Sequence, residues 1–533
     1  MYQLYISTFF ASLGMFQFGY QSAVLNVPQI QVEKFFKDTF RRRNLGNISD
    51  STTITLFSVA TSLTLVGGVI GAIASGWIGN KFGRRNALIY LQLVVLSAAS
   101  LGGICDVCRS FEMLFISRFL AGFASGVFTS LVPLYVSEIA PIHLRGSAAT
   151  SCNLTCCIGT LMAMVLGQNE FLGKPDMWPY VLFVPAVPAI LQLVFMPFMP
   201  ESPRYLLINK RNLEGARRSL TLLRGGINVE EEIEEMLEEK KNREANDSAE
   251  ISESTEQLLG NHETVLQVLK ESKYWLPLFI CICMQVSSQA TGVVALIFYS
   301  TKFFQEAGIS CSLSSLSSVS IGGIFVIMTL LSVILMERLG RRTLHVYIGL
   351  SGMLISSVVL NFALIQEGKK GNGGGSINMT TNVDCSNPNV TTGIKDGEES
   401  IYGILVVVSS LVCVMLFALG PGSIPYFITS EIFEEAPRAA ATSIVMFSNW
   451  SMQIAVALAF PQLQSSLGSY SFLPFLFILL MTWIILVFYL PETKNQSSSK
   501  ISRLFQQPNA WYKSIGFQSP ECLNDLNDNS FGT

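Results

Sequence analysis

Twelve long apolar runs divide this chain, and they constrain its fold more than any other feature. The runs at 181–199 and 472–490 are clear examples, because each approaches the roughly 20 residues that a helix needs to cross a bilayer. Half of all residues are hydrophobic (50%) and only 14% are charged, against about 25% charged residues in soluble domains. Lipid offers the backbone no hydrogen-bond partner, so each run is expected to be helical. The sequence therefore predicts an all-α membrane protein.

The predicted spans form two sets of six, separated by a long polar insert. The expected spans are 3–27, 53–79, 85–105, 111–136, 146–167, 179–199, 274–304, 313–336, 343–366, 400–430, 437–460 and 469–490. We therefore expect an N-terminal six-helix bundle (1–200), a cytosolic helical linker domain (201–273), a C-terminal six-helix bundle (274–490) and a cytosolic tail (491–533). Within the linker, a helix is predicted over 229–243, with Val229, Ile233 and Leu237 on one apolar stripe. No cleavable signal peptide is expected, because the first residues lack a basic region.

The same charged motifs recur at matching positions in the two halves. Gly83-Arg84-Arg85 follows the second span, and Gly340-Arg341-Arg342 follows the eighth. An acid and an arginine return at matching places two spans later, and a Pro-Glu-Ser or Pro-Glu-Thr motif ends each half, at 200–202 and 491–493. Internal repeats of this kind are typical of transporters in which one helical bundle rocks against another.

The repeated charges are predicted to form an ion-pair latch at the cytosolic helix ends. Guanidinium and carboxylate groups pair bidentately, and pairs that form only while the cytosolic side is closed would stabilise the outward-open state. One exposed pair contributes only about 0–1 kcal/mol, so several must act together. The alternative is that the arginines simply anchor the cytosolic face. The latch residues are Arg84, Arg85, Glu138, Arg145, Arg341, Arg342, Glu431 and Arg438.

Glycosylation sequons decide the expected orientation, because the positive charges disagree. Lys and Arg cluster at 81–85, 204–224 and 338–342, which places that face in the cytosol, but the first loop is also basic. The sequons at Asn47, Asn378 and Asn389 lie in loops that share the opposite face by span count. We therefore expect a plasma-membrane glycoprotein with both termini in the cytosol.

Ionisable groups are scarce inside the predicted spans. Away from the span ends no Asp or Glu falls there, since Glu112 is only the second residue of the span 111–136, and the three histidines are predicted to lie in or beside cytosolic loops, at His143, His262 and His345. Proton-coupled transport needs an ionisable relay at membrane depth, so its absence favours passive transport. Arg118 is the one charge far from the ends of a span, and it is expected to face the bundle interior and hydrogen-bond carbonyls or polar side chains. Its role, structural or in the substrate pathway, stays open.

No enzyme, metal site, cofactor or nucleic-acid partner is expected. The spacing assembles no nucleophile, base and orienting group. Cys105 and Cys108 form a C-x-x-C, but no second pair or histidine follows at zinc spacing.

Uncharged polar side chains within the spans supply the candidate binding site. Four Gly and Pro residues interrupt the helix at 420–425, and interrupted helices mark transporter sites because unwound backbone is tolerated only beside a cavity. A neutral polyhydroxyl solute needs hydrogen-bond donors and acceptors and an aromatic face. For each lone Asn or Gln, the alternative is a hydrogen bond between helices. The candidates are Gln289, Asn449, Trp450, Asn153, Tyr426, Ser288 and Thr291.

Seven motifs together resemble the sugar-porter branch of the major facilitator superfamily, specifically the animal facilitative glucose transporters. They are Gln17-Phe18-Gly19-Tyr20, Gly83-Arg84-Arg85, Pro200-Glu201-Ser202-Pro203-Arg204, Glu337-Arg338-Leu339-Gly340-Arg341-Arg342, Gly420-Pro421-Gly422-Ser423-Ile424-Pro425, Phe447-Ser448-Asn449-Trp450 and Pro491-Glu492-Thr493-Lys494. The resemblance covers most of residues 10–495. It implies two pseudo-symmetric six-helix bundles with a helical intracellular domain, alternating access and a small-molecule sugar as the partner.

The pocket departs from the family's glucose pattern at several positions. Departures occur at Asn153, Ser288, Val294, Phe325, Ala418 and Tyr426, whereas Gln289, Asn449 and Trp450 match. Gln21 stands where proton-coupled relatives carry an Asp, which agrees with passive transport. Each lost hydrogen bond would weaken sugar binding by about 0.5–1.5 kcal/mol. The first hypothesis is facilitative transport of a hexose, with glucose expected; the alternatives are a transport-silent sugar sensor and a proton-coupled sugar or polyol symporter.

Overall fold

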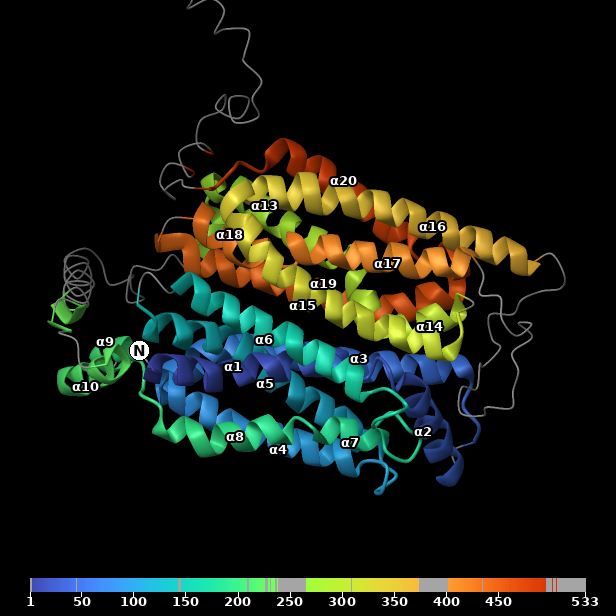
Figure 1. Cartoon of the computed structure of the whole chain (residues 1–533), viewed down its shortest axis with the longest axis horizontal. Coiled ribbons are helices and arrows are strands. Elements are labelled where there is room, and N and C mark those ends of the chain that lie inside the picture. The colour runs from blue at the N-terminus through green and yellow to red at the C-terminus, as the bar shows by residue number, and fades with distance from the viewer. Residues whose placement is uncertain are drawn as a thin grey trace, which may run out of the picture.

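The computed structural model describes most of residues 2–494, with Ile501 and Phe505 beyond them. Its gaps are residues 45, 142–144, 209, 226–228, 231, 235–236, 238–264, 308, 373–400 and 434. Within the described residues every regular element is a helix. The long helices run side by side along the longest axis of the molecule (Figure 1). We call one end of this bundle the α10 end, because α10 (Leu213–Arg224) lies there beside the start of α1 (Tyr2–Ala23), and the other the α2 end, after α2 (Gln29–Arg42).

The long helices pack in two groups, which lie one above the other in Figure 1. The first group contains α1, α2, α3 (Asp50–Phe82), α4 (Arg84–Ile104), α5 (Phe111–Ile139), α6 (Arg145–Leu166), α7 (Trp178–Phe183), α8 (Ala186–Phe195) and the short η2 (Met196–Phe198). The second contains α13 (Ser272–Gln289), α14 (Val293–Glu306), α15 (Cys311–Leu339), η3 (Thr343–Leu350), α16 (Ser351–Asn372), α17 (Ile401–Leu419), α18 (Ile424–Ile432), α19 (Glu435–Leu467), η4 (Gly468–Tyr470) and α20 (Leu473–Tyr489). The groups meet mainly where α3 packs on α19 and α6 packs on α15.

The helices coincide closely with the predicted spans. The span expected over 53–79 is α3, and the span expected over 85–105 is α4. In the described part of the chain, nine helical segments are long and apolar enough to cross a membrane, and α6 and α20 are shorter apolar helices. The all-α membrane fold is therefore confirmed, while the count of twelve crossings stays a prediction.

The first loop contains a helix that the sequence analysis did not predict. In α2, Val32, Phe35 and Phe36 are buried, and Lys34 on the opposite side is exposed. The spacing i, i+3, i+4 is that of an amphipathic surface helix. The segment is too short and too polar to cross a membrane, so it is not among the long apolar runs from which the helices were predicted.

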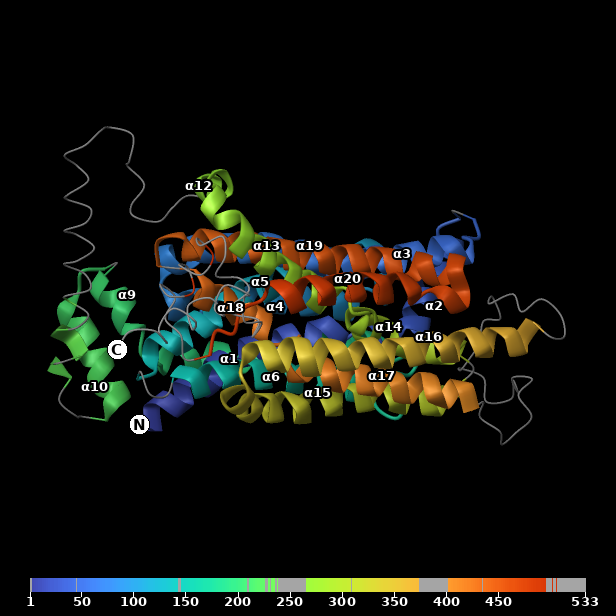
Figure 2. The ribbon, with the colours of Figure 1, turned by 90° about the horizontal axis from the view of Figure 1, so that it is seen from above.

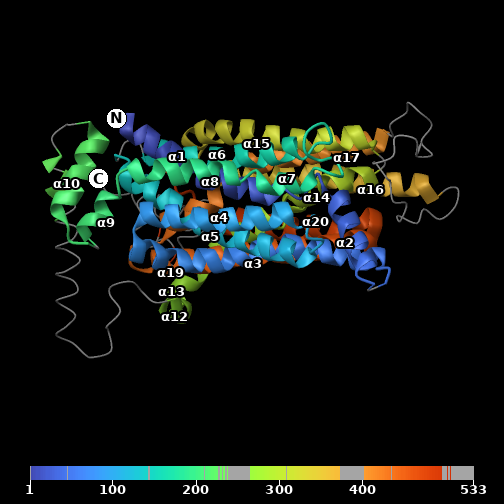
Figure 3. The same cartoon turned by 90° about the horizontal axis from the view of Figure 1, so that it is seen from below.

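Two short helices, α9 (Pro203–Ile208) and α10, form a small cluster at the α10 end, as Figure 2 shows from above and Figure 3 from below. The predicted stripe of Val229, Ile233 and Leu237 packs on this cluster. Most of the helix predicted over 229–243 lies outside the described residues. One further short helix, α12 (Val265–Lys270), leads into α13.

Candidate functional site

Two broken helices of the second group form the centre of the candidate site. One break separates α13 from α14, and the other separates α17 from α18, as the Gly and Pro residues at 420–425 predict. Helix α13 packs on α18. Gly292 at the first break has a φ of +82°, and a Cβ there would lie 2.8 Å from Cε1 of Phe472. A side chain at Gly292 would therefore be both strained and crowded.

A chain of side-chain amides crosses from α19 to the second break. Gln453 donates from Nε2 to Oδ1 of Asn449 over 2.8 Å. Asn449 donates from Nδ2 to Oε1 of Gln285 over 2.9 Å, and Gln285 donates from Nε2 to the Pro425 carbonyl over 3.0 Å. Asn449 was predicted as a site residue, but Gln285 was not. The available signal was its position one helical turn before Gln289, on the same face of α13.

Tyr426 lies between these amides and α6 of the first group. Its phenol interacts with the side chains of Asn449 and Gln289 and lies within electrostatic reach of Cys156 on α6. Tyr426 leaves 46% of its surface exposed, whereas Gln289 and Asn449 leave 3% and 2%. The structure thus brings three predicted residues together, and Tyr426 is the most exposed of them.

Ser288 and Thr291 serve the helix break itself. The Thr291 hydroxyl donates to the Ser288 carbonyl over 3.0 Å and accepts from the Val293 amide over 3.4 Å. Ser288 accepts from Nε2 of Gln289 over 3.4 Å and is fully buried. Both hydroxyls therefore already have partners in the protein. Asn153 is half-buried on α6, one turn before Cys156.

Trp450 lies at the contact between the groups. Its ring packs edge-on against Phe18 of α1, with 6.1 Å between centroids, and only 8% of its surface is exposed. A Cβ added at Gly68 of α3 would lie 2.7 Å from the indole Cζ3. The absence of a side chain at Gly68 is what lets α3 and α19 approach at this point.

Arg118 is buried and fully engaged, which confirms its predicted inward orientation. It donates to Oε1 of Gln21 over 2.6 Å, to the Gln21 carbonyl over 2.9 Å and to the Thr64 hydroxyl over 3.1 Å. The buried guanidinium is therefore balanced by neutral oxygens from α1 and α3 rather than by a carboxylate.

His345 was predicted to lie in or beside a loop, and the structure places it near the start of its span, shortly after Gly340. His345 is fully buried in the π-helix η3, where Nε2 lies 3.4 Å from the Ser287 hydroxyl. A Cβ at Gly420 would lie 3.0 Å from the Cα of His345, so η3 packs tightly on the second helix break.

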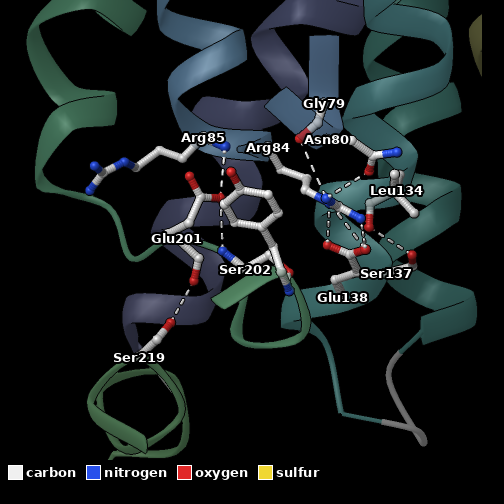
Figure 4. A network of polar contacts seen from close by, with 11 residues as sticks. Gly79, Asn80, Arg84, Arg85, Leu134, Ser137, Glu138, Glu201, Ser202 and Ser219 are labelled. Carbon is white, nitrogen blue, oxygen red and sulfur yellow. Dashed lines mark hydrogen bonds and ion pairs between the residues drawn. The ribbon is translucent and has the colours of Figure 1, made fainter. Parts of the chain in front are cut away.

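The latch residues of the first group form one compact network at the α10 end (Figure 4). Arg84 donates from Nε and Nη2 to the Glu138 carboxylate, each over 3.0 Å, and both side chains are largely buried. Arg85 instead donates to the Met199 carbonyl over 3.0 Å, and its backbone amide donates to Oε1 of Glu201 over 2.9 Å. Glu201 thus caps the N-terminus of α4, where a helix attracts negative charge.

The second group repeats this arrangement. Arg341 pairs with Glu431 over 3.2 Å. The Glu492 carboxylate accepts the backbone amides of Arg341 and Arg342 over 2.9 and 3.1 Å. The capping glutamates belong to the Pro-Glu motifs, which the sequence analysis used only as markers of the halves. They approach the backbone because Gly83 and Gly340 precede the two arginine pairs at φ of +94° and +90°.

These contacts place the latch residues in two separate clusters. The Arg84–Glu138 and Arg341–Glu431 pairs each join helices of the same group. The side chains of Arg145 and Arg438 lie outside the described residues. The pairing across groups that the latch requires therefore stays a prediction.

Several hydrogen bonds and an ion pair join the two groups at the α2 end. Asn26 donates to the Ile297 carbonyl and to the Ser300 hydroxyl, both over 2.8 Å, and accepts from the Thr301 amide over 3.2 Å. Glu33 of α2 forms an ion pair with Lys302 of α14 over 2.7 Å. These contacts hold α14 against the first group. The sequence analysis identified none of them.

Known proteins resemble this chain over nearly its whole length. Residues 7–505 match the family described as "Sugar (and other) transporter". The chain is 34% identical over 496 residues to "Solute carrier family 2, facilitated glucose transporter member 3" of Ovis aries, covering 93% of this chain and 91% of that one. It is also 34% identical to "facilitated glucose transporter member 14" of Homo sapiens, covering 93% and 86%. The solved "partially occluded inward open conformation of the xylose transporter XylE from E. coli" has a TM-score of 0.70 at 21% identity, covering 93% of this chain and 100% of that chain.

Proposed function

The chain belongs to the sugar transporter family of the major facilitator superfamily, and on this premise we propose that it carries a hexose, with glucose expected, passively across the plasma membrane by alternating access. The observation that carries the proposal is the cluster of Gln289, Asn449 and Tyr426 beside two helix breaks. Uncharged amides and a phenol provide both donors and acceptors, which a neutral polyhydroxyl solute requires. The relatives named as facilitated glucose transporters support glucose as the first sugar to test.

Passive transport is supported by the partner of Arg118. The oxygens that balance this buried charge come from Gln21 and Thr64, and neither an amide nor an alcohol changes charge near neutral pH. Proton coupling needs an ionisable relay inside the membrane, and this position cannot supply one. Uptake is therefore expected to be independent of external pH between about 6 and 8, far from the titration range of an amide or an alcohol.

Alternating access is supported by the uneven contacts between the groups. Asn26 and the Glu33–Lys302 pair close the α2 end. If the α10 end is cytosolic, this arrangement corresponds to a state closed toward the outside. The exposed sequon residue Asn47 lies near the α2 end, which agrees with that orientation. Rocking of the two groups would break the Asn26 contacts and expose Tyr426 to the other side.

Radiolabelled glucose uptake in cells that lack their own hexose transporters tests the proposal. The wild type is expected to transport glucose, and Gln289→Ala is expected to lose most uptake while its amount at the cell surface persists. Gln462→Ala is the matched control, because this exposed glutamine lies on α19 at the α2 end and its side chain makes a long contact of 3.5 Å, with Thr55. Unchanged uptake by Gln289→Ala would remove Gln289 from the site.

The same assay separates the alternatives. A transport-silent sugar sensor would take up no hexose although it reaches the cell surface. A proton-coupled symporter would accumulate sugar above its external concentration and lose this accumulation when the proton gradient is collapsed. A panel of glucose, galactose, fructose and polyols in proteoliposomes then identifies the substrate.

A further inference from the structure

The Pro425 carbonyl fixes the direction of the whole amide chain. A carbonyl oxygen can only accept a hydrogen bond, so the group that Gln285 points toward Pro425 must be its NH₂. The other side of the Gln285 amide, its oxygen Oε1, then faces Asn449, which must donate a hydrogen bond to it from Nδ2. The Asn449 oxygen in turn faces the NH₂ of Gln453. One backbone group at the helix break therefore orients three side-chain amides.

We propose that Gln285 is a positioning residue for sugar binding, acting through Asn449. This inference rests on the proposed function and deepens it, because it says how the site presents a defined set of donors and acceptors. An amide has two N–H donors and two acceptor lone pairs. Asn449 uses one of each within this chain of amides, which leaves one N–H and one lone pair for other partners, and Tyr426 interacts with the same side chain.

Because Gln285 and Asn449 are buried, the orientation of their side-chain amides is tightly constrained. Gln285 is fully buried and Asn449 is 2% exposed, so water cannot replace a missing partner of either amide. Without Gln285, the Asn449 amide can rotate by 180°, which exchanges the donor and the acceptor that it presents to the exposed Tyr426. Gln285 itself lies behind Asn449 and need not touch the sugar.

A double-mutant cycle tests this role, with KM for glucose and surface amount measured for each variant. Gln285→Leu in the wild-type background is expected to raise KM about 2- to 13-fold, the equivalent of one net hydrogen bond. In the Asn449→Ala background the same substitution is expected to change KM less than about twofold, because the Asn449 amide that Gln285 positions is already absent. Gln453 is half-buried and lies at the end of the amide chain farthest from Pro425. Gln453→Leu is likewise expected to raise KM in the wild-type background and to change it much less in the Asn449→Ala background.

The control is Gln92→Leu, which removes a buried amide from a glutamine chain within the first group, where Gln17 donates to Gln92 over 3.1 Å. It is expected to reduce surface amount, with KM unchanged in both backgrounds. Equal increases in KM for Gln285→Leu and Gln453→Leu with and without Asn449 would overturn the proposal, as would an unchanged KM. If the wild type transports no hexose at all, the proposed function fails and the inference falls with it. If the wild type transports glucose but the cycle is additive, only the positioning role is refuted.

Discussion

Asn26 offers the sharpest test of how the α2 end is closed. It is 1% exposed and makes three hydrogen bonds to α14, to Ile297, Ser300 and Thr301. Each such bond has a net value of about 0.5–1.5 kcal/mol, and neighbouring bonds do not add fully. Asn26→Ala should therefore destabilise the closed α2 end by about 1.5–3 kcal/mol. The ratio of closed to open molecules is then expected to fall about 10- to 150-fold, since 1.4 kcal/mol corresponds to a factor of ten.

Labelling of a buried reporter cysteine measures this shift. Ser58 of α3 is 1% exposed and interacts with Tyr299 of α14 across the same contact, so Ser58→Cys is reached from outside only when the α2 end opens. The reaction with a membrane-impermeant maleimide is compared with and without the reporter, after the exposed Cys108 has been replaced by serine. The labelling rate is expected to rise at least about tenfold in Asn26→Ala, in line with the population shift.

Gln31→Ala is the matched control for this experiment. Gln31 lies at the same end and donates to the Gly173 carbonyl over 3.0 Å, within the first group only. Its loss should leave the labelling rate unchanged. An unchanged rate in Asn26→Ala, or an equal increase in Gln31→Ala, would refute the reasoning that the Asn26 bonds hold the two groups together.

Two further predictions follow from the helix contacts. Arg84→Gln leaves the largely buried Glu138 carboxylate without its partner and should lower the melting temperature strongly, since breaking a buried pair costs about 3–5 kcal/mol. Adding Glu138→Gln should recover part of this loss. A double variant no more stable than Arg84→Gln alone would contradict this account. Gly68→Val should displace Trp450 and reduce uptake, because a Cβ there lies 2.7 Å from the ring. Gly76→Val on the same helix, where a Cβ meets no atom within 4 Å, should transport normally, and equal losses in both valine variants would count against the Trp450 contact.

Individual site residues could be predicted from the sequence more readily than the hydrogen bonds between them. Gln289, Asn449 and Tyr426 could be predicted because each interrupts an apolar helix, and the structure brings all three together. Gln285 was missed although it lies on the same face of α13 as Gln289. Its role depends on the Pro425 carbonyl, which is 140 residues away in the chain. No periodicity within one helix reports such a partner.

The sequence by itself determined the membrane class, the helix positions, the repeated arginine motifs and the family. These properties are local or additive, because apolar length, glycine spacing and charge act within single segments, and lipid permits few alternatives to a helix. Only the tertiary structure decided which oxygens balance Arg118, that Glu201 and Glu492 cap helices, and that His345 is buried. Each of these depends on groups brought together from distant parts of the chain, where the need to satisfy buried polar groups selects the partner.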